Sequence, residues 1–298
     1  MQKRYFDLHT DTASVMFDSK KHLDENDLHV DLRRTGDFEY VPFMTLFSDC
    51  SRMDMTGRYE ELMENREKET KGRVAFVTSK EEYEMAKKAG LRPALHAIEG
   101  AEMLLCSLEK LEKAILEEKL VMSGISWNNP NALYTASGLT DLGRDYVRLL
   151  NKYHVAADVS HLNDACALEV IDLADRVAAS HSNARALCDV RRDLPDELIR
   201  AIGEKKGVIG LNFYTEFISP EKDKQTLDFL ARHALRIAEL AGVETLAIGS
   251  DFDGCILPEG VHGAEDLMQF ASALERAGFS EKEIDDICFM NAFEYFLK

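Results

Sequence analysis

The chain has 298 residues, and 45% of them are hydrophobic, which is enough to bury a sizeable core. Acidic residues outnumber basic ones by 54 to 36, and the resulting formal net charge of −18 disfavours a surface that binds nucleic-acid phosphates. Six cysteines without a C-x-x-C spacing argue against a thiolate zinc site, and no apolar stretch is long enough to cross a membrane.

The cysteines and the start of the chain indicate a cellular setting. Scattered cysteines in a chain of this size are typical of reduced, buried thiols in a cytosolic protein. No signal peptide is recognisable, because the first apolar run and the first candidate ligand, His9, come at once. We therefore expect a cytoplasmic protein that binds neither nucleic acid nor membrane.

Short apolar runs alternate with longer amphipathic segments along the chain. Most of the runs are nearly continuous in apolar residues, as is typical of parallel strands that are covered on both faces. We expect eight strands, at Tyr5–His9, Val41–Phe47, Pro93–Ile98, Val121–Ser126, Val155–Val159, Arg176–Ser180, Gly207–Asn212 and Thr245–Gly249.

The segments between these strands carry helical patterns. We expect helices at Glu81–Ala89, Leu108–Glu118, Asn163–Ala174, Asp196–Glu204, Leu227–Ala241 and Ser280–Leu297. The fourth follows Pro195, a residue that suits the start of a helix. The highly charged segment Ser51–Arg73 is expected to be a solvated helix inserted after the second strand.

This alternation of strands and helices predicts the fold. Eight strands alternating with helices in about 300 residues are typical of a (β/α)8 (TIM) barrel. The main alternative is an open doubly wound sheet. The barrel is favoured because no G-x-G-x-x-G motif follows the first strand and candidate ligands follow many strands. We expect residues 1–298 to form one α/β barrel domain of the metal-dependent hydrolase type.

Polar residues stand where the apolar runs end, and five of them are typical metal ligands: His9, Asp11, Glu99, His161 and His181. Imidazoles and carboxylates that converge on one point suit a divalent ion such as zinc. Taken singly, each has a structural explanation, such as a turn, a helix cap or a hydrogen-bonded core histidine. Together they fall at the carboxyl ends of strands, where barrels carry their functional residues. His96 has the opposite strand parity to Glu99, and a structural role is expected for it.

Further polar residues lie near the ends of the sixth and last strands. Asp251 follows the last strand and is a natural proton acceptor beside metals. Asp253 is followed by Gly254, so a simple turn is the main interpretation there. Arg191 and Arg192 suit the capture of a substrate carboxylate. Both arginines could equally form surface pairs with nearby aspartates, and the residues alone do not separate the two. For Asp158 the default is a structural hydrogen bond.

These segments resemble the membrane (renal) dipeptidase family, metallopeptidase family M19. The resemblance covers almost the full chain, and several of its motifs are long and chemically unusual. The matching segments are Asp7-Leu8-His9-Thr10-Asp11, Ala97-Ile98-Glu99-Gly100, Gly138-Leu139-Thr140-Asp141-Leu142-Gly143, Asp158-Val159-Ser160-His161, Ser180-His181-Ser182-Asn183-Ala184-Arg185, Arg191-Arg192-Asp193-Leu194-Pro195-Asp196, Gly207-Val208-Ile209, Asn212-Phe213-Tyr214 and Gly249-Ser250-Asp251-Phe252-Asp253-Gly254.

The resemblance implies a (β/α)8 barrel with two Zn²⁺ ions, with other divalent metals as alternatives. It places His9 and Asp11 on one ion, His161 and His181 on the other, and Glu99 as the bridge between them. It further implies hydrolysis of dipeptides, including those with a D-residue at the second position, by a hydroxide that bridges the metals. Asp251 would carry the proton. Arg192 would hold the substrate carboxylate, and Tyr214 would contact the substrate.

One position departs from the family pattern. Family members usually carry a substrate-contacting histidine near the end of the fourth strand, where this chain has Trp127. An indole can donate one hydrogen bond but cannot take up a proton or carry charge. Trp127 is expected to contact the substrate in place of that histidine, and it also fits a related amidohydrolase acting on N-acyl amino acids or cyclic amides. A non-catalytic metal-binding protein on the same scaffold is a third hypothesis. The sequence leaves monomer and homodimer open.

Overall fold

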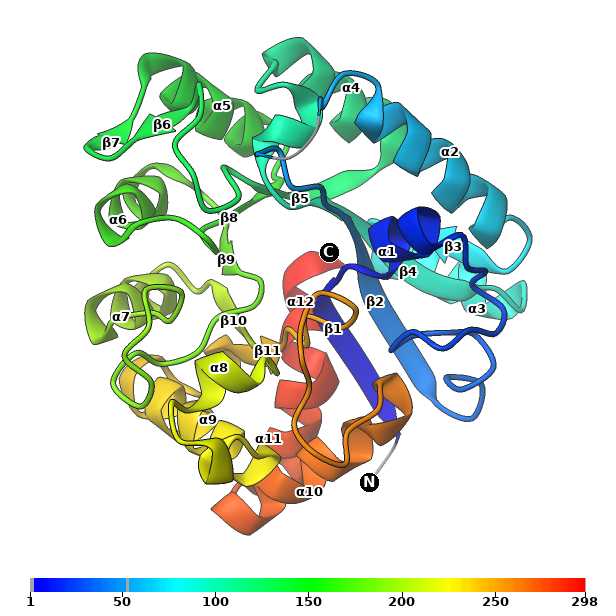
Figure 1. Ribbon diagram of the computed structural model, residues 1–298, viewed down its shortest axis with the longest axis vertical. Coiled ribbons are helices and arrows are strands. Elements are labelled where there is room, and N and C mark those ends of the chain that lie inside the picture. Colours follow the sequence, from blue (N-terminus) through cyan, green and yellow to red (C-terminus); the bar gives the residue numbers. More distant parts are fainter. Residues whose placement is uncertain (1–2, 52–53, 298) are drawn as a thin grey trace.

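The computed structural model of the protein describes residues 3–51 and 54–297, and its centre is a closed ring of eight parallel strands (Figure 1). In the order of the ring, the strands are β2 (Glu39–Leu46), β1 (Arg4–Thr10), β11 (Leu246–Ile248), β10 (Val208–Leu211), β9 (Val177–Ala179), β8 (Ala156–Asp158), β5 (Leu120–Gly124) and β4 (Arg92–Ile98). β4 pairs with β2 and closes the ring. The predicted barrel is confirmed, and the open doubly wound sheet is wrong.

Each of the eight predicted runs overlaps one barrel strand, but three short strands were not expected. β3 (Val74–Phe76) pairs with the first half of β4, while β2 pairs with the second half. β6 (Tyr134–Thr135) and β7 (Gly138–Leu139) form an antiparallel hairpin after β5. None of the three is longer than three residues, so none produces a recognisable hydrophobic pattern.

Helices surround the barrel in Figure 1, and α12 crosses its far end. Six of the helices begin with a side-chain cap from a serine, threonine or asparagine, which satisfies a free backbone N–H. α1, α5, α8 and α10 were not predicted. The helices are α1 (Thr12–Ser19), α2 (Arg58–Thr70), α3 (Lys80–Lys88), α4 (Leu108–Glu118), α5 (Asp141–Lys152), α6 (Asp164–Leu173), α7 (Asp196–Glu204), α8 (Thr215–Ile218), α9 (Leu227–Ala241), α10 (Leu267–Ala277), α11 (Glu281–Asp285) and α12 (Asn291–Phe296).

The C-terminal segment closes the bottom of the barrel. A π-helical turn at Asp286–Met290 joins α11 to α12, so one predicted helix is a helix with an irregular middle. Phe289 and Phe296 pack against Phe6 and Phe43 of the barrel interior. These aromatic contacts fill the end of the barrel opposite to the candidate site.

The helix expected in the charged segment after β2 is present as α2, but it is not solvated on all sides. α2 starts at Arg58, and residues 52 and 53 of the expected helix lie outside the described residues. One face of α2 is buried. On this face, Arg66 reaches inward to Nδ1 of His96, and its guanidinium lies 4.0 Å from the ring centre of Phe76. The Tyr59 hydroxyl contacts Nε2 of the same histidine at 3.1 Å. The structural role expected for His96 is confirmed.

Two expectations drawn from composition agree with the structure. All six cysteines are free thiols, and four of them are buried: Cys106, Cys166, Cys188 and Cys288. Cys50 and Cys255 are partly exposed. None of the helices in the described ranges combines the length and the apolar character that crossing a bilayer requires.

His233 of α9 fastens two loops near the mouth of the barrel. Its Nδ1 accepts a hydrogen bond from the backbone N–H of Ala184 at 3.1 Å, and its Nε2 donates to the carbonyl of Ile218 at 2.8 Å. Burial lowers the pKa of His233 to about 4. The folded protein therefore keeps this ring neutral at pH values where the unfolded chain binds a proton.

This depressed pKa predicts a loss of stability in mild acid. An unfolded histidine titrates near pH 6.5, so the stabilisation is complete above that pH and is lost as the pH falls towards 4. Between pH 7 and pH 5 the wild type should lose about 2 kcal/mol more unfolding free energy than His233→Gln. Urea unfolding at both pH values measures this difference. The control is the exposed Leu116 changed to glutamine, which removes no titrating group and should keep the wild-type difference between the two pH values.

Candidate active site

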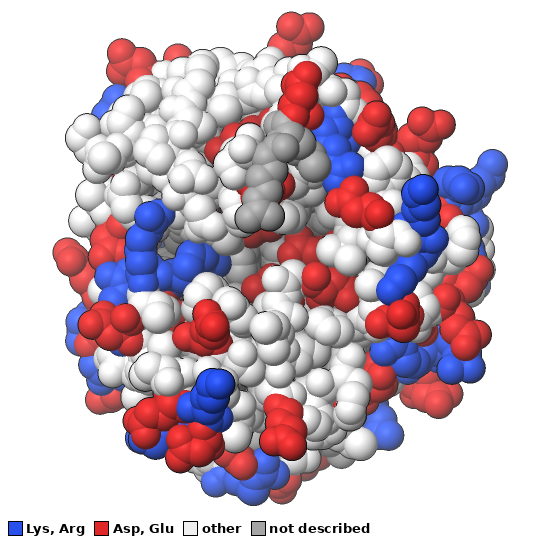
Figure 2. Space-filling view, viewed as in Figure 1, with Lys and Arg blue, Asp and Glu red and all other residues white. Residues whose placement is uncertain are grey.

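Side chains from four barrel strands meet in a cavity of about 350 Å³ at the carboxyl ends of the strands. Their elements are β1 and the residue after it, and the ends of β4, β8 and β9. The five predicted ligands, His9, Asp11, Glu99, His161 and His181, are all less than 9% exposed. Figure 2 shows this face hollowed near its middle, with basic side chains at one edge of the hollow and acidic ones across it.

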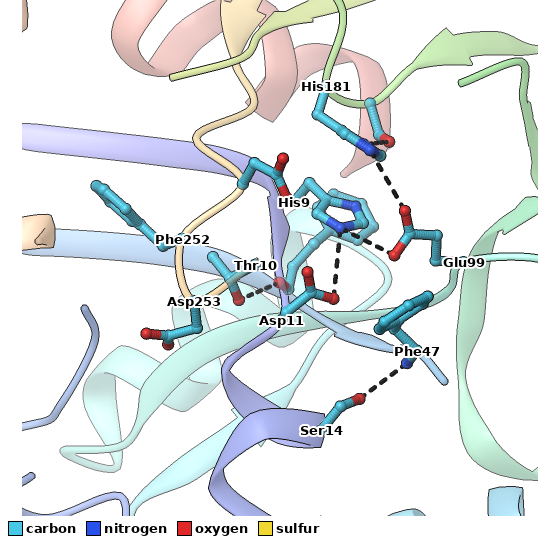
Figure 3. Close-up of polar contacts among 12 residues, drawn as sticks. His9, Thr10, Asp11, Ser14, Phe47, Glu99, His181, Phe252 and Asp253 are labelled. Carbon is cyan, nitrogen blue, oxygen red and sulfur yellow. Dashed lines mark hydrogen bonds and ion pairs between the residues drawn. The ribbon is translucent and has the colours of Figure 1, made fainter. Parts of the chain in front are cut away.

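Glu99 stands at the centre of this group and divides it in two. Its Oε2 lies 3.5 Å from Nε2 of His9, which is itself 3.7 Å from Oδ1 of Asp11 (Figure 3). Its Oε1 lies 2.5 Å from Nε2 of His161 and 3.4 Å from Nε2 of His181. Ligand atoms on a tetrahedral zinc ion are about 3.3 Å apart. The spacing therefore suits two divalent ions that share one carboxylate.

The polar atoms of the first group lack other partners. Within residues 3–51 and 54–297, the two ring nitrogens of His9 and Oδ1 of Asp11 have no hydrogen-bond partner. Buried polar atoms are rarely left without a partner, because desolvation is costly. The ligand atoms of His9, Asp11 and Glu99 lie within 4.8 Å of one another. An imidazole with two carboxylates is a donor set for zinc or a similar ion, so these residues fit a metal.

Neighbouring side chains orient the other two imidazoles. Nδ1 of His161 contacts Oδ1 of Asn128 at 2.8 Å, and Nδ1 of His181 contacts Oγ of Ser180 at 2.7 Å. Ser180 in turn donates to Asp158 at 2.5 Å, so the expected structural role of Asp158 is confirmed. With a proton on each Nδ1, the Nε2 lone pairs face Glu99. Such outer contacts fix the tautomer of a metal-binding histidine.

The charges of the group shift its pKa values strongly. Burial lowers the pKa of His9, but the nearby Glu99 and Asp11 outweigh burial and raise it well above its usual range. Burial, with the charge of Glu99, raises the pKa of Asp11 to about 6. Burial, with the charge of Arg192, lowers the pKa of His161 to about 4. A divalent ion would replace the proton that His9 otherwise holds between two carboxylates.

Asp251 faces the ligand group from the end of β11. Burial, together with the charges of Asp11 and Glu99, raises the pKa of Asp251 to about 7 against the opposing effect of His9. Its Oδ2 accepts a hydrogen bond from Nδ2 of Asn212 at 3.1 Å. The ligand atoms of His9, His181 and Asp251 also lie within 4.8 Å of one another. The carboxyl group is therefore beside the ligands and able to exchange a proton near neutral pH.

Asp253 has a different, structural position. Its carboxylate accepts hydrogen bonds from Oγ1 of Thr12 and from the backbone N–H of His29, both at 2.5 Å. Figure 3 shows this side chain pointing away from the ring of His9. The turn predicted at this position is present, since the N–H of Gly254 bonds to the carbonyl of Asp251. Asp253 additionally ties that turn to α1 and to the long loop before β2.

Arg191 and Arg192 have different positions relative to the cavity. Arg192 lines the cavity, where its Nη2 lies 3.1 Å from Nε2 of His161 and its guanidinium carbon 5.5 Å from the ring centre of Phe217. No carboxylate of the described chain lies within ion-pair distance of it. Arg191 is exposed and donates to the carbonyl of Asn128 at 3.1 Å. Surface pairing with the adjacent aspartates is therefore wrong for both residues, and Arg192 is free to take an anion.

The remaining predicted residues line the same cavity. Trp127 lies with its ring centre 5.0 Å from that of Phe47 and 6.1 Å from that of His161. Tyr214 packs edge-on against Phe217 at 4.7 Å. The structure thus brings all nine predicted site residues to one place. It adds residues that sequence reasoning did not select, namely Phe47, Asn128, Asn212 and Phe217.

A methyl group at Gly254 would disrupt the first ligand group. A Cβ built there collides with Oδ2 of Asp11 and lies 2.6 Å from Oδ1 of Asp251. We expect Gly254→Ala to lose metal at the His9–Asp11 position, measured as ions per chain after dialysis. The control is Gly90→Ala, which has a positive φ of 73° and open space around it. It should cost about 1–2 kcal/mol of stability without changing the metal content.

A (β/α)8 barrel with a carboxylate-centred group of candidate metal ligands in its mouth is typical of metal-dependent barrel proteins. Within that class, the sequence model described as membrane dipeptidase (peptidase family M19) matches residues 1–296, and the chain belongs to this family.

Two curated proteins are similar to parts of the chain. An uncharacterised protein of Klebsiella pneumoniae is 32% identical over 57% of this chain and 64% of its own length. An uncharacterised dipeptidase of Schizosaccharomyces pombe is 32% identical over 53% of this chain and 39% of its own length. The matched parts thus span less than two thirds of these curated relatives.

Solved structures show the same fold. A metallopeptidase of Rhodobacter sphaeroides, solved with a phosphinate mimic of the dipeptide L-Ala-D-Ala, superimposes with a TM-score of 0.84. The two chains are 22% identical, and the match covers 99% of each. At that identity the similarity concerns the arrangement of the barrel and its helices.

Proposed function

We propose that this protein is a metal-dependent dipeptidase that holds two divalent ions, zinc first among them. One observation carries the proposal: two ligand groups that share Glu99 lie in the same cavity as Arg192, a guanidinium with no carboxylate partner in the described chain. His9 and Asp11 would hold one ion, and His161 and His181 the other. The family to which the chain belongs supports this assignment.

The side chains around the ligands have separate tasks in amide hydrolysis. Bound ions would polarise the scissile carbonyl and acidify the attacking water. Asp251, with its pKa near 7, takes the proton of that water and returns it to the leaving amine. Asn212 holds one oxygen of this carboxylate, which leaves the other for the proton. A pKa near 7 suits a group that acts first as a base and then as an acid at neutral pH.

Arg192 would fix the free carboxylate of the dipeptide. Phe217 packs against one side of the guanidinium, which limits its rotation and keeps its donors towards the cavity. Holding one end of the substrate makes attack on the amide nearly intramolecular. Dipeptides with a D-residue at the second position belong to the proposed range. The R. sphaeroides metallopeptidase, solved with a mimic of L-Ala-D-Ala, supports this choice.

Metal analysis and a dipeptide panel test the proposal. Protein loaded with zinc should hold two ions per chain and hydrolyse dipeptides, and chelation should abolish turnover. Changing Arg192 to glutamine should lower kcat/KM for a free dipeptide by about 30-fold or more, since a charged pair in a buried site contributes 2 kcal/mol or more. The same change should matter little for the dipeptide amide, which lacks the carboxylate. A zinc-loaded protein that hydrolyses no dipeptide contradicts the proposal.

Hydrolysis of N-acyl amino acids is the second candidate, and Trp127 favours it. The indole lies beside the ligand group and cannot accept a proton. An acyl group carries no ammonium, so it loses less hydration free energy beside an apolar indole than a charged amino terminus does. A kcat/KM for N-acyl amino acids above that for dipeptides with the same carboxy-terminal residue would decide for this candidate.

A further inference from the structure

The mouth of the barrel has two unlike sides. β9 is four strands away from β2 in either direction around the ring, and Figure 1 shows them on opposite sides of the barrel. Arg192 lies in the connection after β9, and Phe217 in α8 after β10. Phe47 follows β2 directly, and Trp127 follows β5, which lies two strands from β2 and two strands from β9. Phe47 therefore faces the cationic side across the ligand group, and Trp127, in ring contact with Phe47, continues this second side along the rim.

The second side is an aromatic wall, formed by Phe47 and Trp127. The two rings are 5.0 Å apart at 51°, and both are partly exposed to the cavity. The backbone N–H of Phe47 donates to Oγ of Ser14 at 2.8 Å, which fixes the start of its loop. Two aromatic rings that line a cavity form a surface suited to an apolar ligand group.

Hydrogen bonds to Glu102 fix the loop that carries Trp127. Oε1 of Glu102 accepts hydrogen bonds from Oγ of Ser126 at 2.9 Å and from Nδ2 of Asn131 at 2.7 Å. Asn131 also donates to the carbonyl of Ile125. The wall is thus built on fixed backbone, and pre-organised apolar surface binds at a lower entropic cost than a mobile loop.

No free charge stands at the aromatic wall among the described residues that line the cavity. The acidic residues there are Asp11, Glu99, Asp251 and Asp253. The first two are proposed metal ligands and the third is the proposed proton carrier. Asp253 is occupied by Thr12 and His29. A charged substituent would lose its hydration at the wall without gaining a counterion.

We propose that the aromatic wall selects substrates with an apolar group on the amino side of the scissile amide, either a large side chain or an acyl chain. This inference rests on the proposed function. With the carboxylate at Arg192 and the amide over the central ligands, the group on the other side of the amide reaches Phe47 and Trp127. Burial of a phenylalanine side chain corresponds to a gain of about 10- to 100-fold in kcat/KM over glycine.

A dipeptide series with a fixed second residue tests the wall. The series is Gly-Ala, Ala-Ala, Leu-Ala, Phe-Ala and Asp-Ala, each with L- and D-alanine. We expect kcat/KM to rise about 10-fold or more from Gly-Ala to Phe-Ala and to be lowest for Asp-Ala. In Phe47→Ala, the Phe-Ala to Gly-Ala ratio should fall to less than about a third of the wild-type ratio. Phe47→Leu, which keeps apolar volume, should retain most of it.

The control is Phe229→Ala, a partly exposed phenylalanine of α9 outside the cavity, which should keep the wild-type ratio. Metal content and circular dichroism verify that each variant is folded. A parallel N-acetyl and N-benzoyl alanine series distinguishes a side chain from an acyl group as the occupant. The inference is overturned, while the proposed function stands, if an active wild type has a Phe-Ala to Gly-Ala ratio of kcat/KM near one. The same holds if Phe47→Ala leaves that ratio unchanged. A protein that hydrolyses neither series overturns the proposed function, and the inference with it.

Discussion

Asp251→Asn is expected to lower kcat by about 10²- to 10⁴-fold while the protein keeps its metal, because the amide cannot carry the proton. The replacement is conservative in every other respect. Residue 251 has a φ of 61°, a conformation that asparagine adopts readily, and the amide oxygen can still accept the hydrogen bond from Asn212. Steady-state kinetics on a dipeptide, with metal analysis of the same sample, measure both quantities.

Asp253→Asn is the matched control for this experiment. Its φ is 70°, its carboxylate is buried, and it lies two residues away in the same turn. It binds Thr12 and His29 and does not belong to the ligand groups, so its loss should appear as a stability cost of about 1–3 kcal/mol. Turnover by Asp251→Asn within 10-fold of wild type would exclude Asp251 as the proton carrier. Lost turnover with normal metal content would exclude the non-catalytic hypothesis.

The barrel could be predicted because its signal is repeated eight times. Runs such as Leu246–Ile248 are fully buried and contain apolar residues only, so periodicity and spacing identify them. α2 was misjudged for an opposite reason: its sequence is dominated by charge. Arg66 carries its charge into the interior, where a histidine ring and an aromatic face receive it. Composition alone cannot report such a pairing across 30 residues.

The candidate ligands could be located because each follows a strand, and parallel strands end at one rim. Their partners were harder to find. Asn128 orients His161 across 33 residues, and Asn212 holds Asp251 across 39. Both contacts depend on the closed ring, which brings loops after different strands together. Asn212 lies in one of the segments that resemble the dipeptidase family. Nothing in the sequence distinguished Asn128 from the asparagines beside it.

Glu99→Gln is expected to reduce the metal content from two ions to at most one per chain. Glu99 is the residue whose two oxygens face both ligand groups, and an amide offers one neutral oxygen and an N–H donor in their place. Turnover should fall by about 10²- to 10³-fold or more, because metal ions contribute several kcal/mol to transition-state stabilisation and 1.4 kcal/mol is tenfold in rate. Zinc titration with a chromophoric chelator, followed by kinetics at saturating zinc, measures both effects.

Glu102→Gln provides the control, since Glu102 is a half-buried glutamate three residues further along the chain. Its carboxylate holds Ser126 and Asn131, and an amide oxygen can accept the same two hydrogen bonds. Two ions should therefore remain bound. If Glu102→Gln lost metal as strongly as Glu99→Gln, the loss would reflect a general response of this rim to removing a carboxylate. If Glu99→Gln kept both ions, each pair, His9 with Asp11 and His161 with His181, would bind its ion without a shared carboxylate.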